Sequence, residues 1–301
     1  MSQLATVHIG HWTGAGTGVT VLLPPEGTVG SGEVRGGAPA TREFALLDPA
    51  RMMDRVDAVV LSGGSAFGLA AADGVMRLLH ERGSGFATPA GPVPIVVGMS
   101  LFDGVLGPHA PGPAEGRAAA VAALLGEPLR SGKVGAGTGA TSGKHSGKLF
   151  PGGFGWAQRR IATGASPTQD TTIALAAVAV VNAWGDIIGP TGSPTFSDAD
   201  GVPLPARGAG QGVAPQGLQA TTLVVVITDA RLSKLDCHLL AQSGHDGLVR
   251  ALDPVHTRFD GDAVVALATG AAGIAGDTDA LRAATPHVVA DAIRGAATPA
   301  A

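Results

Sequence analysis

The sequence predicts an α/β fold in which sheets and helices are stacked in layers. Hydrophobic residues make up 45% of the 301 residues and charged residues 15%, a composition typical of a folded globule and not of a disordered chain. Apolar runs alternate along the chain with segments of helical periodicity, as expected for layered sheets and helices. Residues 173–181 are all apolar, which suits a strand covered on both faces.

The individual elements follow from apolar periodicity and from the signals that begin and end helices. Strands are expected over 19–23, 57–61, 92–98, 154–163 (an edge strand), 173–181, 221–228 and 263–269, with a glycine-laced strand or loop over 133–141. Helices are expected over 48–55, 66–82, 114–125, 233–252 and 277–293. Residues 189–220 show no periodicity and are rich in Gly, Pro, Ser and Asp. A loop this long inside a compact domain usually has a function.

Charge and composition narrow the range of partners. A formal net charge of −4 removes the usual electrostatic reason to bind nucleic acid. No apolar run approaches the roughly 20 residues that cross a bilayer, and the first ten residues do not resemble a signal peptide. The single cysteine, Cys237, forms no internal disulfide. We therefore expect a cytoplasmic protein without membrane or nucleic-acid partners.

Two motifs that suggest a cofactor do not meet the requirements of their chemistry. The segment 137–145 resembles a phosphate-binding loop, but Thr138 stands where the first glycine belongs and His145 where a hydroxyl should bind magnesium. Cys237 and His238 are adjacent on a predicted helix and point about a hundred degrees apart, so they do not converge on a metal with His245. We expect neither a nucleotide nor a metal cofactor.

Ser65 offers one hydrolytic alternative. It lies in the turn 62–65 between a predicted strand and a predicted helix, which is the context of a nucleophile elbow, although Phe67 replaces the glycine that this motif needs. Histidines that a serine triad requires follow later in the chain, at His238, His245 and His256. The glycines of the turn also fit a purely structural role, in which they let the helix approach the sheet closely.

Thr221 offers a second hydrolytic alternative. It is the first residue of a β-branched run and follows the long aperiodic segment, so the chain there can be cut without destroying a sheet. Cutting before Thr221 would create an α-amine that titrates near pH 7.7 to 8.0, close enough to neutrality to act as base for its own hydroxyl. The same pattern fits a threonine that only begins a strand.

A wider set of residues resembles one known family. The set includes 11–13, 22–28, 36–43, 61–69, 73–74, 135–141, 181–186, 221–230 and 245–248. These segments are similar to the L-aminopeptidase/D-esterase family, which includes β-aminopeptidases and the nylon-oligomer (6-aminohexanoate-oligomer) endohydrolase. The resemblance covers nearly the whole chain. It implies a four-layer αββα sandwich of two stacked sheets between helices, of the N-terminal-nucleophile type, and an enzyme that hydrolyses amide bonds.

The resemblance also implies roles for particular residues. The chain is expected to be a single domain, 1–301, that cleaves itself between Ala220 and Thr221 into 1–220 and 221–301, with Thr221 as nucleophile. Asn182 matches the asparagine that stabilises the oxyanion, and Asp260 and Asp262 match the pair that contacts the nucleophile. Being two residues apart on an extended segment, the two carboxylates are expected to face the same side. A solvated Asp-Gly-Asp turn is the alternative.

Three departures from the family leave parts of this assignment open. Ala220 precedes the nucleophile where the nylon-oligomer enzyme has asparagine, and the chain has no tyrosine to line the site. The family lysine has no direct counterpart, so Lys144 and Lys148 are the candidates, and Lys144 is preferred because it adjoins the glycine-rich segment.

The expected substrate is a short amide or peptide that carries a free amine, such as an amino-acid amide or a 6-aminohexanoate oligomer. A homotetramer is expected by resemblance. The alternatives are a serine-triad esterase or amidase that uses Ser65, an amino-acid acetyltransferase of the ornithine acetyltransferase type, and a non-enzymatic binding protein.

Overall fold

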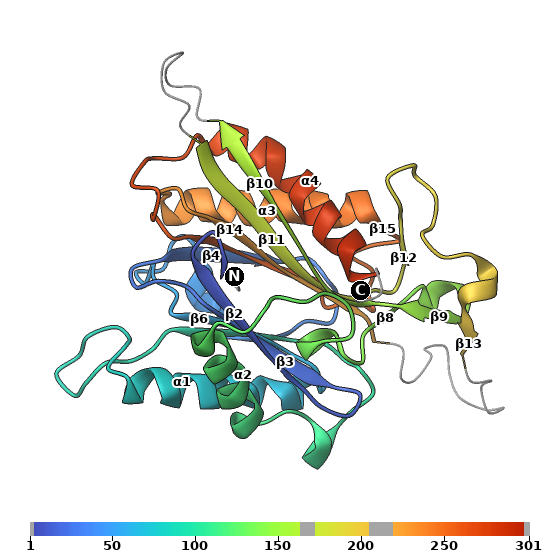
Figure 1. Ribbon diagram of the computed structural model, residues 1–301, viewed down its shortest axis with the longest axis horizontal. Coiled ribbons are helices and arrows are strands. Elements are labelled where there is room, and N and C mark those ends of the chain that lie inside the picture. The colour runs from blue at the N-terminus through green and yellow to red at the C-terminus, as the bar shows by residue number, and fades with distance from the viewer. Residues whose placement is uncertain (1–2, 163–171, 205–218, 298–301) are drawn as a thin grey trace.

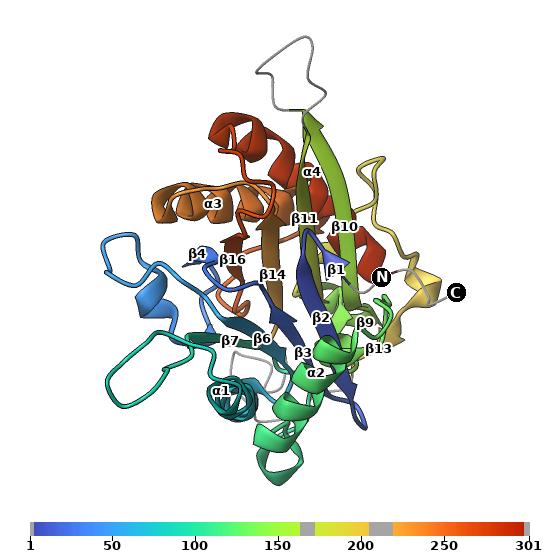
Figure 2. The same ribbon diagram turned by 60° about the vertical axis from the view of Figure 1, so that its left-hand side comes forward.

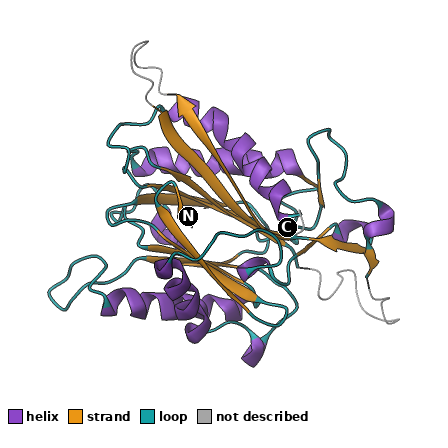
Figure 3. Cartoon of the chain, in the orientation of Figure 1, coloured by secondary structure: helices purple, strands orange, loops and turns teal. Residues whose placement is uncertain are grey.

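The computed structural model describes residues 3–162, 172–204 and 219–297, and its two large sheets lie between two pairs of helices. Figure 1 shows the four layers, from α1 and α2 at the bottom to α3 and α4 at the top. The first sheet has the strand order β1-β2-β3-β6-β7-β5, and the second has the order β10-β11-β14-β16-β4. Figure 2 shows the strands of the second sheet side by side, and Figure 3 shows helices outside and strands inside.

The strands of the first sheet are β1 (Gln3–Leu4), β2 (Val7–Thr13), β3 (Gly18–Leu23), β5 (Ala40–Arg42), β6 (Ala58–Ser62) and β7 (Val96–Ser100). Those of the second are β4 (Val29–Val34), β10 (Gly153–Ala162), β11 (Thr172–Asn182), β14 (Thr221–Thr228) and β16 (Ala263–Ala268). The helices are α1 (Ala71–Glu81), α2 (Pro113–Leu125), α3 (Lys234–Ala251) and α4 (Thr278–Ala296). Short strands form two further small sheets: β8 (Thr141–Ser142), β9 (Lys148–Pro151), β12 (Asp186–Ile187), β13 (Val202–Pro203) and β15 (Leu252–Asp253).

Among the described residues, three hydrophobic clusters correspond to the three interfaces between the four layers. One lies between the second sheet and the helices α3 and α4, one lies between the two sheets, and one joins the first sheet to α1 and α2. Strand β11 supplies both sides of its sheet, because its alternate residues belong to different clusters. The prediction that this run is covered on both faces is confirmed, as is the four-layer fold.

The predicted strands and helices recur with shifted ends, with one exception. No helix forms over 48–55, where the Asp48 side chain accepts the Ala50 N–H at 2.7 Å and closes a turn. The Nζ of Lys234, on α3, donates hydrogen bonds to main-chain carbonyls of this region, including those of Arg51 at 3.0 Å and Met53 at 2.8 Å. The predicted helix is wrong because these carbonyls accept hydrogen bonds from a lysine on a distant helix and not from N–H groups of a helix of their own.

The segment 66–82 is helical in two parts, a 3-10 turn over Ser65–Ala70 followed by α1. The glycine-laced segment 133–141 contains a 3-10 turn over Gly135–Gly137. In the segment 189–220, β13 pairs with β9, and residues 205–218 lie outside the described part of the chain. Every helix in the described ranges is too short or too polar to cross a bilayer.

Candidate active site

Thr221 and Asn182 lie opposite one another at the end of the second sheet. They are the last pair in the antiparallel ladder between β11 and β14. Directly opposed residues of such a ladder have Cβ atoms about 4.5 to 5.5 Å apart on the same face. Both side chains are almost fully buried, with 3% of Thr221 and 1% of Asn182 exposed. The ladder therefore brings the predicted nucleophile next to the predicted oxyanion donor.

Both side chains face the space between the two sheets. Strand residues two apart share a face, and Leu223 and Val180, the next residues in step with Thr221 and Asn182, belong to the cluster between the sheets. The Asn182 amide nitrogen, Nδ2, donates to the carbonyl of Phe102 at 2.7 Å. Because Phe102 follows β7 of the first sheet, this hydrogen bond ties the two sheets together at the site.

The peptide bond between Ala220 and Thr221 is held by main-chain hydrogen bonds. The Ala220 N–H donates to the carbonyl of Phe259 at 3.0 Å, and the Gly261 N–H donates to the carbonyl of Ala220 at 2.9 Å. Thr221 Oγ1 donates to the same Ala220 carbonyl oxygen. The hydroxyl of Thr221 consequently lies against the carbonyl group that precedes it.

Lys144 is buried beside Asn182 in a turn flanked by two glycines. Four oxygens surround Nζ: Asn182 Oδ1 at 2.9 Å, and the carbonyls of Thr141 at 2.8 Å, Asn182 at 3.0 Å and Ala183 at 3.2 Å. Gly143 and Gly147 adopt φ values of +73° and +78°, which favour glycine and allow the tight turn. Lys148, the other candidate, instead pairs with Asp198 at 2.9 Å.

Burial lowers the pKa of the Lys144 ammonium to about 7, a decrease that the Asp260 carboxylate opposes and the charge of Lys133 reinforces. Lys144 also fixes the orientation of the Asn182 amide. Oδ1 accepts from Lys144 Nζ and from the Thr141 N–H at 3.0 Å, so the amide oxygen must point toward these donors. Of the two N–H bonds on Nδ2, one goes to Phe102, and the other makes no hydrogen bond within the described residues. This second N–H is available to a developing oxyanion.

Asp262 binds the residue that follows Thr221. Its Oδ1 accepts the Thr222 N–H at 2.7 Å, and its Oδ2 accepts from His256 Nδ1 at 2.8 Å and from the His256 N–H at 3.1 Å. His256 has a φ of +54°, uncommon for a residue other than glycine, and its ring packs edge-on against that of His245 at 4.9 Å. Asp262 thus fixes the start of β14 and in turn is fixed by His256.

Both carboxylate oxygens of Asp260 accept hydrogen bonds from nearby residues. Oδ1 accepts the Trp184 N–H at 3.2 Å, and Oδ2 accepts the Thr257 N–H at 2.9 Å and the Thr257 hydroxyl at 2.5 Å. Burial raises the pKa of Asp260, the nearby Asp262 adds to the increase, and the hydrogen bonds oppose it. Within the described residues, neither Asp260 nor Asp262 hydrogen-bonds to Thr221. Asp262 is linked to Thr221 through the main chain of the next residue. The Asp260 carboxylate instead binds Trp184 and Thr257. Both carboxylates are buried, so the segment is not a solvated turn.

The structure separates Ser65 from the histidines of the alternative triad. Ser65 begins the 3-10 turn that leads into α1, whereas His238 and His245 lie on α3, on the opposite outer layer of the sandwich. His256 contacts Asp262 and His245. In the part of the chain that the structure describes, Ser65 forms no hydrogen bond with a histidine. The serine-triad alternative is not supported by this geometry.

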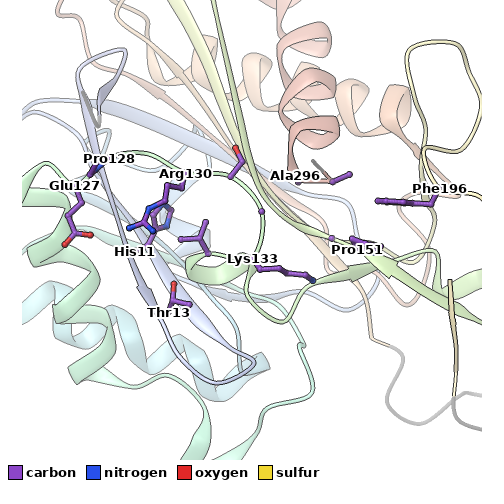
Figure 4. Close-up of a pocket in the computed structure, with 14 residues that line it drawn as sticks. His11, Thr13, Glu127, Pro128, Arg130, Lys133, Pro151, Phe196 and Ala296 are labelled. Carbon is purple, nitrogen blue, oxygen red and sulfur yellow. The ribbon is translucent and has the colours of Figure 1, made fainter. Parts of the chain in front are cut away.

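A cavity of about 780 Å³ lies close to the polar cluster formed by Thr221, Asn182, Lys144, Asp260 and Asp262, but none of these residues lines it. His11, Arg130 and Lys133 contribute to its lining, and Figure 4 shows Arg130 beside His11. Burial, helped by the charge of Arg130, lowers the pKa of His11 to about 4, so this ring is neutral at pH 7. Lys133 Nζ donates to the carbonyl of Ala140, whose successor Thr141 donates to Asn182. One stretch of main chain therefore separates the cavity from Asn182, and its lining contains none of the predicted site residues.

Sequence reasoning missed the roles of three residues around Thr221 and the two carboxylates. Thr257 and His256 hold the two carboxylates, and Gly261 donates to the carbonyl of Ala220. No spacing rule identifies Thr257 or His256, because both act from a loop. Gly261 had one available signal, since it is the glycine between the two predicted aspartates.

Comparisons with known proteins agree with this architecture. The model of peptidase family S58 matches residues 2–301. A relative from Mycobacterium leprae (strain TN), named as an uncharacterized aminopeptidase, is 42% identical over 313 residues, covering 95% of this chain and 83% of the relative. A 6-aminohexanoate-oligomer endohydrolase from Paenarthrobacter ureafaciens is 28% identical over 284 residues, covering 86% of this chain and 71% of that enzyme.

A solved structure supports the fold. The L-aminopeptidase D-Ala-esterase/amidase from Ochrobactrum anthropi, described as a variant of the Ntn hydrolase fold, has a TM-score of 0.73 at 20% identity, covering 97% of this chain and 84% of that one. The protein has the Ntn hydrolase fold, and the relatives define it as a hydrolase that cleaves amide or peptide bonds. The chain belongs to peptidase family S58. The predicted resemblance is confirmed, and the non-enzymatic alternative is wrong.

Proposed function

We propose that the protein cuts itself between Ala220 and Thr221, and that Thr221, as a new amino terminus, is the nucleophile of amide hydrolysis. The observation that carries the proposal is the contact between Thr221 Oγ1 and the carbonyl oxygen of Ala220. It brings the hydroxyl next to the carbon that it must attack. The fragments 1–220 and 221–301 would stay together, because β14 pairs with β11 and β16 pairs with β4 across the two pieces.

In the cleaved protein, the α-amine of Thr221 takes the proton of its own hydroxyl during attack on the substrate carbonyl. An α-amine titrates near pH 7.7 to 8.0, so about a tenth of it is unprotonated at pH 7 and can act as the base. Asp262 holds the adjacent Thr222 N–H, and the second N–H of Asn182 Nδ2 stabilises the oxyanion. Lys144 holds the Asn182 side chain in this orientation.

Denaturing electrophoresis of the purified protein tests the proposal. Wild type should give two bands, with the smaller beginning at Thr221, and Thr221→Ala should stay whole and inactive. Ser65→Ala is the matched control, and it should cut itself and turn over substrate at the wild-type rate. An intact wild type that hydrolyses amides, or a Ser65→Ala variant that folds without activity, contradicts the proposal.

We propose short amides or peptides with a free amine as substrates. The relatives support this class, since one is named an aminopeptidase and another an endohydrolase of 6-aminohexanoate oligomers. The carboxylates of Asp260 and Asp262 provide negative charge near Thr221 that would attract an ammonium group.

A pair of substrates tests this proposal. An amide with a free amine should exceed its N-acetylated form in kcat/KM by about tenfold, which is roughly 1.4 kcal/mol and modest for a charge-assisted contact. Equal rates for the two forms mean that the site has no amine subsite. Acetyl transfer to an amino acid by the same protein would instead favour the acetyltransferase alternative.

We also propose that the protein assembles as a homotetramer. Helix α2 leaves apolar side chains exposed, including Leu125, which is 75% exposed, and Leu124 and Val121, each 38% exposed. Burying such a face is a common reason for self-association. Light scattering at micromolar concentration should give four chains per particle, and a monomer there contradicts the proposal.

A further inference from the structure

We propose that the main-chain N–H of Gly261 stabilises the negative charge that forms on the Ala220 carbonyl oxygen during self-cleavage. The inference rests on the proposed self-processing and assigns a catalytic residue to that step. In the uncut chain, the Gly261 nitrogen lies 2.9 Å from the Ala220 carbonyl oxygen and donates to it. Within the described residues the Asn182 amide makes no hydrogen bond to this oxygen, and the one bond that its Nδ2 donates goes to the carbonyl of Phe102.

The sheet aligns this donor with the carbonyl. Ala220 forms a parallel bridge with Asp260, and the neighbouring ladder between β14 and β16 continues the same register, with Leu223 opposite Ala263. The bridge supplies both the Ala220 N–H bond to Phe259 and the Gly261 N–H bond to Ala220. The donor is therefore in place before the reaction begins, which is the condition for effective oxyanion stabilisation.

Neighbouring segments hold the donor strand from both sides. On one side, the Ala38 N–H donates to the carbonyl of Asp260 at 2.8 Å, and the Arg35 N–H donates to the carbonyl of Asp262 at 3.0 Å. On the other, the Asp262 side chain takes the Thr222 N–H at 2.7 Å. Gly261 lies between these contacts, so its N–H has little freedom to turn away from Ala220.

Space explains why a glycine occupies this position. A Cβ added to Gly261 would lie 2.8 Å from Thr221 Oγ1 and 2.7 Å from the carbonyl oxygen of Ala38. A methyl group there would push the attacking hydroxyl or the main chain out of place. Gly261 thus brings its N–H close to the scissile carbonyl while leaving room for the nucleophile.

The reaction that this donor assists balances without a cofactor. Thr221 Oγ1 forms a bond to the carbonyl carbon of Ala220, and the carbonyl electron pair moves onto the oxygen that Gly261 faces. The bond between that carbon and the Thr221 nitrogen then breaks, the nitrogen gains the hydroxyl proton, and an ester remains between Ala220 and Thr221. Water hydrolyses the ester to the Ala220 carboxylate and the Thr221 hydroxyl, leaving a free amine on Thr221.

Mutagenesis provides the first test, read as the rate at which newly folded precursor disappears on denaturing gels. Gly261→Ala should slow cleavage about 100-fold, because the added Cβ collides with the Ala38 carbonyl and shifts the main chain that carries the donor N–H, and hydroxylamine, which attacks esters, should not restore it. Gly189→Ala is the matched control, since its added Cβ would come no closer than 3.4 Å to a neighbouring atom. It should cleave at the wild-type rate.

The single cysteine allows a second test that removes only the donor. A recombinant 1–236 thioester can be ligated at Cys237 to synthetic 237–301, prepared with either a normal peptide bond or an ester oxygen in place of the Gly261 N–H. After refolding, the ester protein should cleave about 100-fold more slowly than its all-amide counterpart, as is typical when one oxyanion donor is lost.

Circular dichroism verifies folding in each case. Cleavage of Gly261→Ala or of the folded ester protein within threefold of its control overturns the inference and leaves self-processing standing. If the ester protein does not fold, the Gly261→Ala rate decides alone. An all-amide control that folds and stays whole refutes self-processing itself, so the two failures are distinguishable.

Discussion

The middle of the five-stranded sheet and its polar end are equally buried and chemically opposite. In the middle, Val178, Val225 and Val265 are inaccessible to solvent and belong to the apolar core between the sheets. At the end, Asn182 and Thr221 are at most 3% exposed, yet their polar atoms are hydrogen-bonded. Burial alone therefore does not distinguish core from site. The difference is that buried polar groups must find partners, and these come from loops outside the sheet.

Shortening a side chain in the apolar part should have the largest effect on stability. Ile227, inaccessible to solvent, lies about 20 Å along β14 from Thr221. Ile227→Ala should lower the free energy of unfolding by about 2 to 5 kcal/mol through lost burial and a cavity. Urea unfolding measures this loss. At low temperature, the folded variant should keep kcat/KM within about twofold of wild type, and a large loss of activity would mean that the two regions are not independent.

Removing Lys144 from the polar end should lower activity, whereas Ile227→Ala should lower stability and spare activity. Lys144→Met leaves Asn182 Oδ1 and three carbonyls without their ammonium donor, and a buried acceptor without a partner costs about 1 to 3 kcal/mol. We expect kcat/KM to fall about 10- to 100-fold. Lys148→Met, which loses only a contact with the exposed Asp198, is the control and should stay near wild type. Equal activity of the two variants would remove Lys144 from the site.

The polar end should also respond to pH where the apolar part does not. Burial lowers the pKa of Lys144 to about 7 in the folded protein from an ordinary value of 10.5. Between these values the unfolded chain binds a proton that the folded chain lacks, so this contribution to stability rises from pH 7 toward 10.5 and is lost on acidification. Urea unfolding of wild type and Lys144→Met between pH 7 and 10 measures the difference. Parallel pH curves would show that Lys144 stays charged when folded.

Two adjacent threonines give the smallest and sharpest contrast. Thr222 Oγ1 is buried and has no hydrogen-bond partner among the described residues, whereas Thr221 Oγ1 contacts Ala220. Thr222→Val replaces an unsatisfied hydroxyl by a methyl of similar size and should stabilise the protein by about 1 kcal/mol without loss of activity. Thermal unfolding and the amide assay test this expectation. Destabilisation would indicate that the Thr222 hydroxyl has a partner in solution.

The sequence by itself determined the layered fold and one residue of the proposed chemistry. Apolar periodicity is a local property, so the strands at 173–181 and 221–228 and the helix at 233–252 were predicted nearly to their ends. The same run placed Thr221 at the start of a strand. The roles of Asn182, Asp260 and Asp262 came from resemblance, because a single buried polar residue has no periodic signal.

Only the tertiary structure decided how the polar groups are joined. It places Lys144, and not Lys148, beside Asn182. It joins Asp262 to Thr222 and His256, and the Gly261 N–H to the carbonyl of Ala220. It also replaced the expected helix at 48–55 with a turn held by Lys234. Each of these contacts joins segments distant in sequence through loops without periodicity. Their partners are set by which loops the packed sheets bring together, since a buried polar atom takes the partner that folding places beside it.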